Sequence, residues 1–203
     1  MNAKASKHVH DMVYIALGAV LITVCSWISI PTEIPFTLQT MAVVFVCALL
    51  GGGRGCVSVV IYILLGAVGV PVFAGMTGGF AKLIGMTGGY IIGFIFTALV
   101  MWLFQKLFGK DSLLWTAVSM VLGIAVCYLF GSVWFYIVYV NNTGAIGVGS
   151  VLAMCVVPFI IPDLIKIALA LVLSNRLRKI LKGKLDYIYT HLNVCVNHMH
   201  RNV

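Results

Sequence analysis

Apolar residues run along this chain in six long stretches, which shorter polar or glycine-rich segments separate. The stretches cover approximately residues 13–30, 37–50, 55–73, 88–108, 113–140 and 150–174. A helix needs about 20 apolar residues to cross the hydrocarbon core of a bilayer. The pattern therefore predicts an all-α integral membrane protein, a bundle of six transmembrane helices in which residues 1–184 form a single membrane domain.

Prolines mark where several of these helices begin or end. The second stretch follows Pro31 and Pro35, and the third ends at Pro71. Proline is well tolerated in the first turn of a helix, where its missing N–H has no partner to lose. The sixth stretch contains Pro158 and Pro162, so we expect its helix to begin near Pro162.

Composition supports a membrane location and excludes one class of partner. The chain of 203 residues is 62% hydrophobic and 9% charged, whereas soluble domains carry about 25% charged residues. Its net charge of +8 would suit nucleic acid, but the basic residues fall in short patches between apolar stretches, as they do in membrane proteins. We therefore expect membrane lipid around this chain and no nucleic acid.

Lysine and arginine are distributed unequally between the two sides of the predicted bundle. If the N-terminus is cytoplasmic, eleven of the thirteen basic residues lie on the inner side, and only Lys82 and Lys166 lie on the outer side. This is the bias that membrane proteins show. We therefore predict that both termini are cytoplasmic, including a polar tail at residues 185–203. The structured extracellular loops that would form a ligand pocket are residues 29–40, 71–89 and 141–162.

A glycine-rich segment between the third and fourth stretches predicts part of that pocket. Gly-Met-Thr-Gly-Gly occurs at residues 75–79 and again at 85–89, with Lys82 between the copies. Glycine disfavours helix, and non-helical backbone cannot face lipid because its N–H and C=O groups would lack partners. We therefore expect this segment to form the wall of a ligand site. The glycines predicted to contact the ligand are Gly75, Gly78 and Gly79.

Charged residues inside apolar stretches are costly and usually functional. Asp163 and Lys166 lie three residues apart, so they share one face of a helix. Two interpretations stay open: the two side chains pair with each other, or both contact a polar ligand. A ligand carboxylate would suit Lys166 or Lys82, and a ligand N–H would suit Asp163. Lys82 has its own alternative, which is to reach the outer membrane interface.

Several uncharged residues are further candidates. Thr37 and Gln39 place a hydroxyl and an amide at the outer end of the second span, where they would serve either as helix caps or as ligand contacts. Tyr90 follows the second Gly-Gly and could stack on a ligand or hydrogen-bond it. On the first span the small residues Ala16, Ala19 and Thr23 would serve either internal packing or the docking of a partner helix.

The sequence contains no motif for catalysis or metal binding that we could identify. Walker A, Gly-x-Ser-x-Gly and His-Glu-x-x-His patterns are absent, and none of the six cysteines forms a Cys-x-x-Cys pair. We therefore predict no catalytic residue, metal site or cofactor. If transport uses ATP, a separate subunit must bind the nucleotide.

Four segments of this chain resemble the signature of the BioY family. They are IPFTLQT at residues 34–40, YILLGAVGVPVFAG at 62–75, TGGYIIGF at 87–94 and PFIIPDLIK at 158–166. The family comprises the biotin-specific S components of energy-coupling factor (ECF) transporters. The resemblance runs from about residue 12 to residue 180.

The resemblance implies a function, a ligand and partners. It implies a multi-pass protein of the bacterial cytoplasmic membrane that binds biotin near its outer face with high affinity. It also implies a transmembrane coupling subunit and two cytoplasmic ATPases as partners. The chain would then be no enzyme, and biotin would be a transported ligand.

Three other functions remain as alternatives at this stage. The first is an intramembrane enzyme that uses Asp163 and Lys166 as an acid/base pair. The second is a solitary biotin transporter without ATPase partners, and the third is an assembly subunit that binds no ligand. Biotin itself suits the predicted site, since its ureido N–H groups match Asp163 and its carboxylate matches an ammonium, though the choice between Lys82 and Lys166 stays open.

Overall fold

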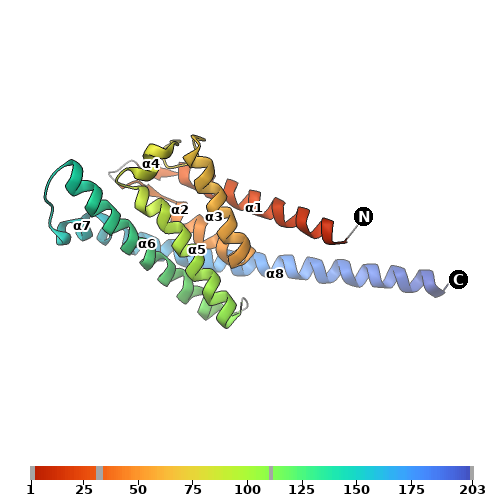
Figure 1. Cartoon of the computed structure of the whole chain (residues 1–203). Coiled ribbons are helices and arrows are strands. Elements are labelled where there is room, and N and C mark those ends of the chain that lie inside the picture. Colours follow the sequence, from red (N-terminus) through yellow and green to blue (C-terminus); the bar gives the residue numbers. More distant parts are fainter. Residues whose placement is uncertain (1–2, 31–33, 110–111, 202–203) are drawn as a thin grey trace.

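Long helices dominate the fold (Figure 1). The computed structural model describes residues 3–30, 34–109 and 112–201, with side chains within residues 8–180 of that part. Four segments of the described chain are long and apolar enough to cross a membrane, judged by length and composition. These are His8–Trp27, Gly88–Phe108, Leu113–Asn142 and Val148–Ile180. The prediction of a mainly helical integral membrane protein is therefore confirmed.

Two shorter apolar helices form the middle of the bundle. Helix α1 (Ala3–Trp27) precedes them, and α2 (Gln39–Leu50) and α3 (Gly52–Ala67) follow, separated only by Gly51 at φ +86°. At 12 and 16 residues, α2 and α3 fall short of the roughly 20 residues that a full crossing needs. The count of six membrane-crossing helices therefore stays a prediction.

The side chain of Gln105 stabilises the break between α2 and α3. Its Oε1 accepts a hydrogen bond from the N–H of Gly52 at 2.7 Å, and its Nε2 donates to the carbonyl oxygen of Cys47 at 3.1 Å. Backbone groups at helix ends lack intrahelical partners. One buried amide therefore satisfies a group on each side of the break.

The connection after α1 adds a short strand pairing that the sequence did not predict and that leaves the fold mainly helical. Strand β1 (Ser29–Ile30) pairs antiparallel with β2 (Phe36–Thr37), with Ser29 opposite Thr37 and Ile30 opposite Phe36. Pro35, directly before β2, lacks the N–H that a helix needs and lies outside any helix.

The glycine-rich segment is partly helical, which the sequence did not predict. Helix α4 (Phe80–Ile84) lies between the two glycine repeats, and α5 (Gly88–Phe108) already includes the last two glycines of the second repeat. A Cβ added to Gly88 would lie 1.8 Å from the carbonyl oxygen of Leu83. The glycine at this position therefore permits a close approach of the two helices rather than preventing helix formation.

The last part of the chain also differs from the prediction. After α6 (Leu113–Asn142) and the short α7 (Val148–Cys155), helix α8 begins at Val157 and runs to Arg201, with Pro162 inside it. The sequence predicts a helix that begins near Pro162. Instead the break falls at Val156, and Pro158 occupies the first turn, where proline is tolerated. The predicted domain boundary at residue 184 lies within α8 and stays a prediction.

Helix α2 occupies the centre of the bundle and positions the site. It packs against α1, α3, α5, α6 and α8, while α5 and α6 form an extensive antiparallel pair. Both ends of the chain lie toward the same end of the molecule, whereas α4 and α7 lie toward the other (Figure 1). The polar residues at the start of α2 therefore face several helices at once.

Candidate functional site

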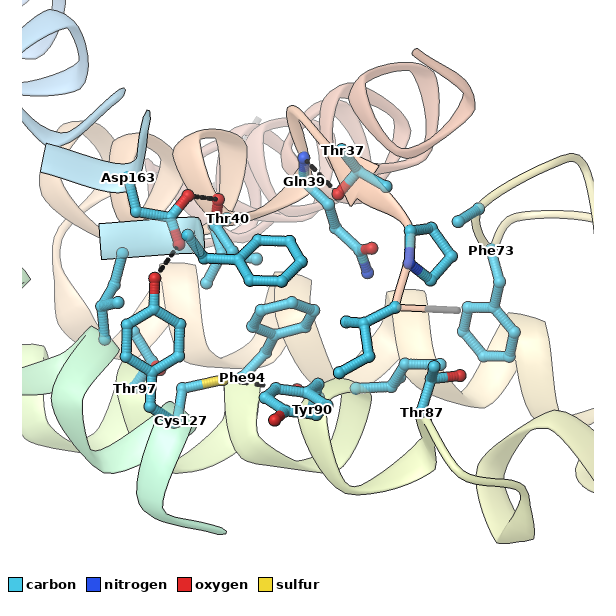
Figure 2. Close-up of a pocket in the computed structure, with 18 of the residues that line it drawn as sticks. Thr37, Gln39, Thr40, Phe73, Thr87, Tyr90, Phe94, Thr97, Cys127 and Asp163 are labelled. Carbon is cyan, nitrogen blue, oxygen red and sulfur yellow. Dashed lines mark hydrogen bonds between the residues drawn. The ribbon is translucent and has the colours of Figure 1, made fainter. Parts of the chain in front are cut away.

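A pocket lies beside the start of α2, at the end of the bundle where α4 and α7 are found. The empty space between its walls, with the open solvent at its mouth included, is about 910 Å³. Its walls come from the chain around β2, the start of α2, the segment between α3 and α5, and the facing sides of α5, α6 and α8. Figure 2 shows how these elements surround one space.

An ion pair is buried in one wall of this pocket. The Nζ of Lys166 lies 2.8 Å from Oδ1 of Asp163, and the two residues are 5% and 2% exposed. The carboxylate accepts two further hydrogen bonds, from Thr40 Oγ1 at 3.1 Å and from the Tyr128 hydroxyl (Figure 2). A buried charge of this kind persists only when it is paired and hydrogen-bonded, and Asp163 meets both conditions.

The ammonium of Lys166 is equally well supplied with partners. It donates to the carbonyl oxygen of Thr37 at 2.7 Å and lies 3.4 Å from Thr40 Oγ1. It also lies 4.0 Å from the centroid of the Phe36 ring, an attractive cation–π arrangement. The structure shows the first interpretation of this pair, because Asp163 and Lys166 bind each other. Both also line the pocket, and their contact with a ligand stays a prediction.

A second polar group comes from the first turn of α2. The Nε2 of Gln39 donates to the Tyr62 hydroxyl at 2.7 Å, and the Thr37 hydroxyl accepts a hydrogen bond from the Gln39 N–H at 3.2 Å. Gln39 is 5% exposed, and Figure 2 shows its side chain directed toward the middle of the pocket. The Thr37 hydroxyl thus bonds the backbone at the start of α2, but it is not the cap, because the cap position is Leu38 and no side chain caps this helix end. Gln39 presents an amide to the pocket.

The opposite wall is mainly aromatic and apolar. Tyr90 on α5 forms a hydrogen bond with Ser132 on α6, with 3.2 Å between the oxygens. Phe94, Ile124 and Cys127 continue this wall. An apolar enclosure with a few placed polar groups is typical of small-molecule sites.

Six of the nine predicted ligand residues come together around this space. They are Thr37, Gln39, Lys82, Tyr90, Asp163 and Lys166. The three glycines do not line the pocket and instead shape the loop beside it. Gly75 and Gly79 adopt positive φ angles of +68° and +99°, and a Cβ on Gly78 would lie 2.3 Å from the carbonyl oxygen of Val70.

Sequence reasoning missed other residues of the site. Tyr128 and Phe159 line the pocket, and Phe36 stacks on Phe159 with 5.9 Å between ring centroids. Thr40 lies at the outer end of the second span, where the sequence leaves open a helix cap or a ligand contact, and it lines the pocket too. A signal existed for Tyr128, since a tyrosine within an apolar span needs a partner for its hydroxyl, but the sequence did not indicate which partner.

The small residues of α1 pack mainly within the bundle. Ala19 is 3% exposed and Thr23 is 9% exposed, and the Thr23 hydroxyl donates to the Ala19 carbonyl oxygen at 2.9 Å. Of the three candidate docking residues only Ala16 is exposed. Internal packing therefore accounts for Ala19 and Thr23, and a docking face on α1 would have to use Ala16 and its exposed neighbours.

Comparison with known proteins gives one consistent picture. Residues 1–183 match the BioY family. "Biotin transporter BioY" of Thermotoga maritima is 40% identical over 161 residues, which cover 79% of this chain and 90% of that protein. "Probable biotin transporter BioY" of Pyrococcus horikoshii is 36% identical over 165 residues, covering 81% and 93%.

A solved structure is similar over most of the fold. It is the crystal structure of the S-component for biotin from an ECF-type ABC transporter, with a TM-score of 0.77 and 28% sequence identity. The similarity covers 88% of this chain and 95% of the solved one. Residues 1–183, which match the BioY family, include the helices that form the pocket.

Proposed function

The chain belongs to the BioY family, and from this premise we propose that it is a high-affinity biotin-binding S component of a vitamin uptake transporter. The observation that supports this most directly is the pocket, where a fully hydrogen-bonded ion pair faces an apolar wall. Biotin has the matching halves, a polar ureido ring and an apolar thioether ring with a valerate chain.

The polar groups of the pocket match the ureido ring. The ring offers two N–H donors and one carbonyl acceptor, and Asp163, Tyr128 and Gln39 offer the complementary groups. A buried polar group without a partner costs about 1–3 kcal/mol, so this complementarity discriminates against ligands that lack the ureido group. We propose Thr37, Gln39, Lys82, Tyr90, Asp163 and Lys166 as ligand contacts, with Gly75, Gly78 and Gly79 shaping the adjoining loop.

We place the chain in the bacterial cytoplasmic membrane as six spans, with α2 and α3 crossing as the two short ones. Basic residues concentrate on the side proposed to be cytoplasmic, which agrees with the charge bias of membrane proteins. Both chain ends lie toward one end of the bundle, and α4, whose Lys82 lines the pocket, lies toward the other (Figure 1). The pocket would then open to the outside.

We propose that a transmembrane coupling subunit and two cytoplasmic ATPases complete the transporter. The solved neighbour is described as part of an ECF-type ABC transporter, and this sequence has no Walker A motif of its own. The solitary transporter remains the alternative. The intramembrane enzyme is disfavoured, because Asp163 and Lys166 are already engaged with each other and with Thr37, Thr40 and Tyr128.

Mass spectrometry of the purified chain tests the proposal. The protein is extracted in detergent from cells supplied with biotin, and small molecules that co-purify are identified. Unmodified biotin is the expected result; an altered product would indicate the enzyme, and no ligand would indicate an assembly subunit. Biotin uptake by cells lacking their own transporters, with and without a coupling module, then separates the ECF-dependent from the solitary transporter.

A further inference from the structure

Lys82 is a charged side chain of the pocket that the ion pair leaves without a role. We infer that Lys82 binds the ligand carboxylate at the pocket mouth, while the ion pair of Asp163 and Lys166 holds the ring at the other end. The inference rests on the proposed function. It states which way biotin lies in the pocket and which side chain recognises its carboxylate.

The charges that line the pocket do not cancel. Among the described lining residues the acidic and basic side chains are Lys82, Asp163 and Lys166. Asp163 and Lys166 neutralise each other, so one positive charge remains. Biotin carries a single carboxylate, which is ionised at neutral pH. The net charge of the described lining residues and that of the ligand are therefore complementary.

Lys166 has no donor left for a carboxylate. An ammonium has three N–H donors, and Lys166 directs them toward Thr37, Thr40 and Asp163 while its charge lies over the Phe36 ring. A carboxylate that took one of these donors would also approach the negatively charged Asp163. Burying two carboxylates on one ammonium leaves a charge unpaired, which is strongly unfavourable.

Lys82, in contrast, has no competing acid among the described side chains. Two acidic side chains are described, and each is already paired: Asp163 with Lys166, and Asp11 with Arg54 at 2.8 Å. No hydrogen bond or ion pair of the Lys82 ammonium occurs in the described part of the chain. Lys82 is exposed yet lines the pocket, as expected for a cation at its mouth.

The geometry of the pocket agrees with this orientation. In Figure 2 Asp163 lies at one end, and Phe73 and Thr87 lie at the opposite end. Lys82 belongs to α4, in the same segment between Phe73 and Thr87. Phe94 on α5 lies between the two ends in Figure 2, and Ile91 on α5 and Ile124 on α6 also line the pocket. The ring can therefore occupy the ion-pair end while the valerate methylenes follow the apolar wall to Lys82.

Binding of biotin and of biotinamide separates this role from a structural one. Biotinamide keeps the ring and chain but replaces the carboxylate by a neutral amide of similar size. We expect the wild-type protein in detergent to bind biotin about tenfold more tightly than biotinamide, the effect of one partly exposed charged hydrogen bond. Lys82→Ala should lose this preference by weakening biotin alone, and Lys82→Arg should retain most of it. Lys106→Ala, which removes an exposed lysine of α5, is the matched control and should change neither affinity.

Salt concentration gives a second readout. Because an exposed ion pair is screened by salt, the preference for biotin should shrink with ionic strength in the wild type and not in Lys82→Ala. Equal weakening of both ligands by Lys82→Ala, or no weakening of either, would overturn the inference. A wild-type protein that binds neither ligand would instead contradict the proposed function.

Discussion

The ammonium of Lys166 on α8 donates a hydrogen bond to the backbone carbonyl oxygen of Thr37 in β2, 2.7 Å away and 129 residues earlier in the chain. Its second strong partner, Asp163, lies on its own helix at 2.8 Å. One side chain therefore joins the last helix to the connection between α1 and α2. The ion pair in this way holds one wall of the pocket against another.

Replacing Lys166 by methionine should destabilise the fold and abolish biotin binding. The change leaves the buried carboxylate of Asp163 without its counter-charge, and breaking a buried pair in this way costs about 3–5 kcal/mol. The free energy of unfolding in a dodecyl sulfate titration of the detergent-solubilised protein measures the loss.

The double variant Asp163→Asn with Lys166→Met separates stability from binding. It restores neutrality. The asparagine oxygen still accepts from one of Thr40 and Tyr128, and its NH2 group donates to the hydroxyl oxygen of the other. We expect it to recover most of the stability and to bind biotin at least about tenfold more weakly than the wild type. Full recovery of binding in the double variant would mean that the ion pair is structural only.

Tyr128→Phe should weaken biotin binding with a small effect on folding. The variant removes one of the three groups that donate to Asp163, and the loss of one hydrogen bond inside a membrane protein costs about 0.5–2 kcal/mol. We expect a 2- to 30-fold rise in the dissociation constant, measured by equilibrium binding (about 1.4 kcal/mol per tenfold). Tyr136→Phe alters an exposed tyrosine of the same helix and should have no effect.

Gly78→Ala should disrupt the loop between α3 and α4 and reduce binding. The new Cβ would lie 2.3 Å from the carbonyl oxygen of Val70, and a backbone atom cannot move aside as a flexible side chain does. Gly79→Ala meets no atom within 4 Å but has φ at +99°, so we expect a smaller loss of about 1 kcal/mol in stability.

Gly149→Ala is the control for both glycine variants. Gly149 lies in α7 without a nearby atom or a positive φ angle, and alanine favours helix more than glycine does. Stability and biotin affinity should therefore match or slightly exceed those of the wild type. Normal binding by Gly78→Ala would show that the loop does not support the pocket.

Gln105→Leu should lower stability without a direct effect on the binding site. It leaves the buried N–H of Gly52 and carbonyl of Cys47 without the partners they have at the break between α2 and α3. Each unsatisfied group costs about 1–3 kcal/mol, which the same titration in dodecyl sulfate detects. At dodecyl sulfate concentrations below its unfolding midpoint, the variant should bind biotin with an unchanged dissociation constant. A large rise in that constant would indicate that the break between α2 and α3 is coupled to the pocket.

The helical stretches could be predicted because membrane insertion depends on local hydrophobicity. Each apolar run carries its own signal. The ends of α1, α5 and α6 therefore lie within a few residues of the predicted ends, except the start of α1, which lies at Ala3 and not near residue 13. Helix ends at glycine and proline were predicted less well. Gly88 lies inside α5, where the backbone of Leu83 approaches it closely, and Pro162 lies inside α8. The residues next to them in the sequence do not indicate these positions.

The individual charges of the site were also visible in the sequence, since an acid and a lysine within an apolar run are rare and costly. Their spacing placed Asp163 and Lys166 on one face of a helix. Their remaining partners, Thr37, Thr40 and Tyr128, come from elements far away in the chain. Hydrogen bonds act over about 3 Å, so only the packing of α2, α6 and α8 could decide which polar groups meet, and which lysine is left free for a ligand.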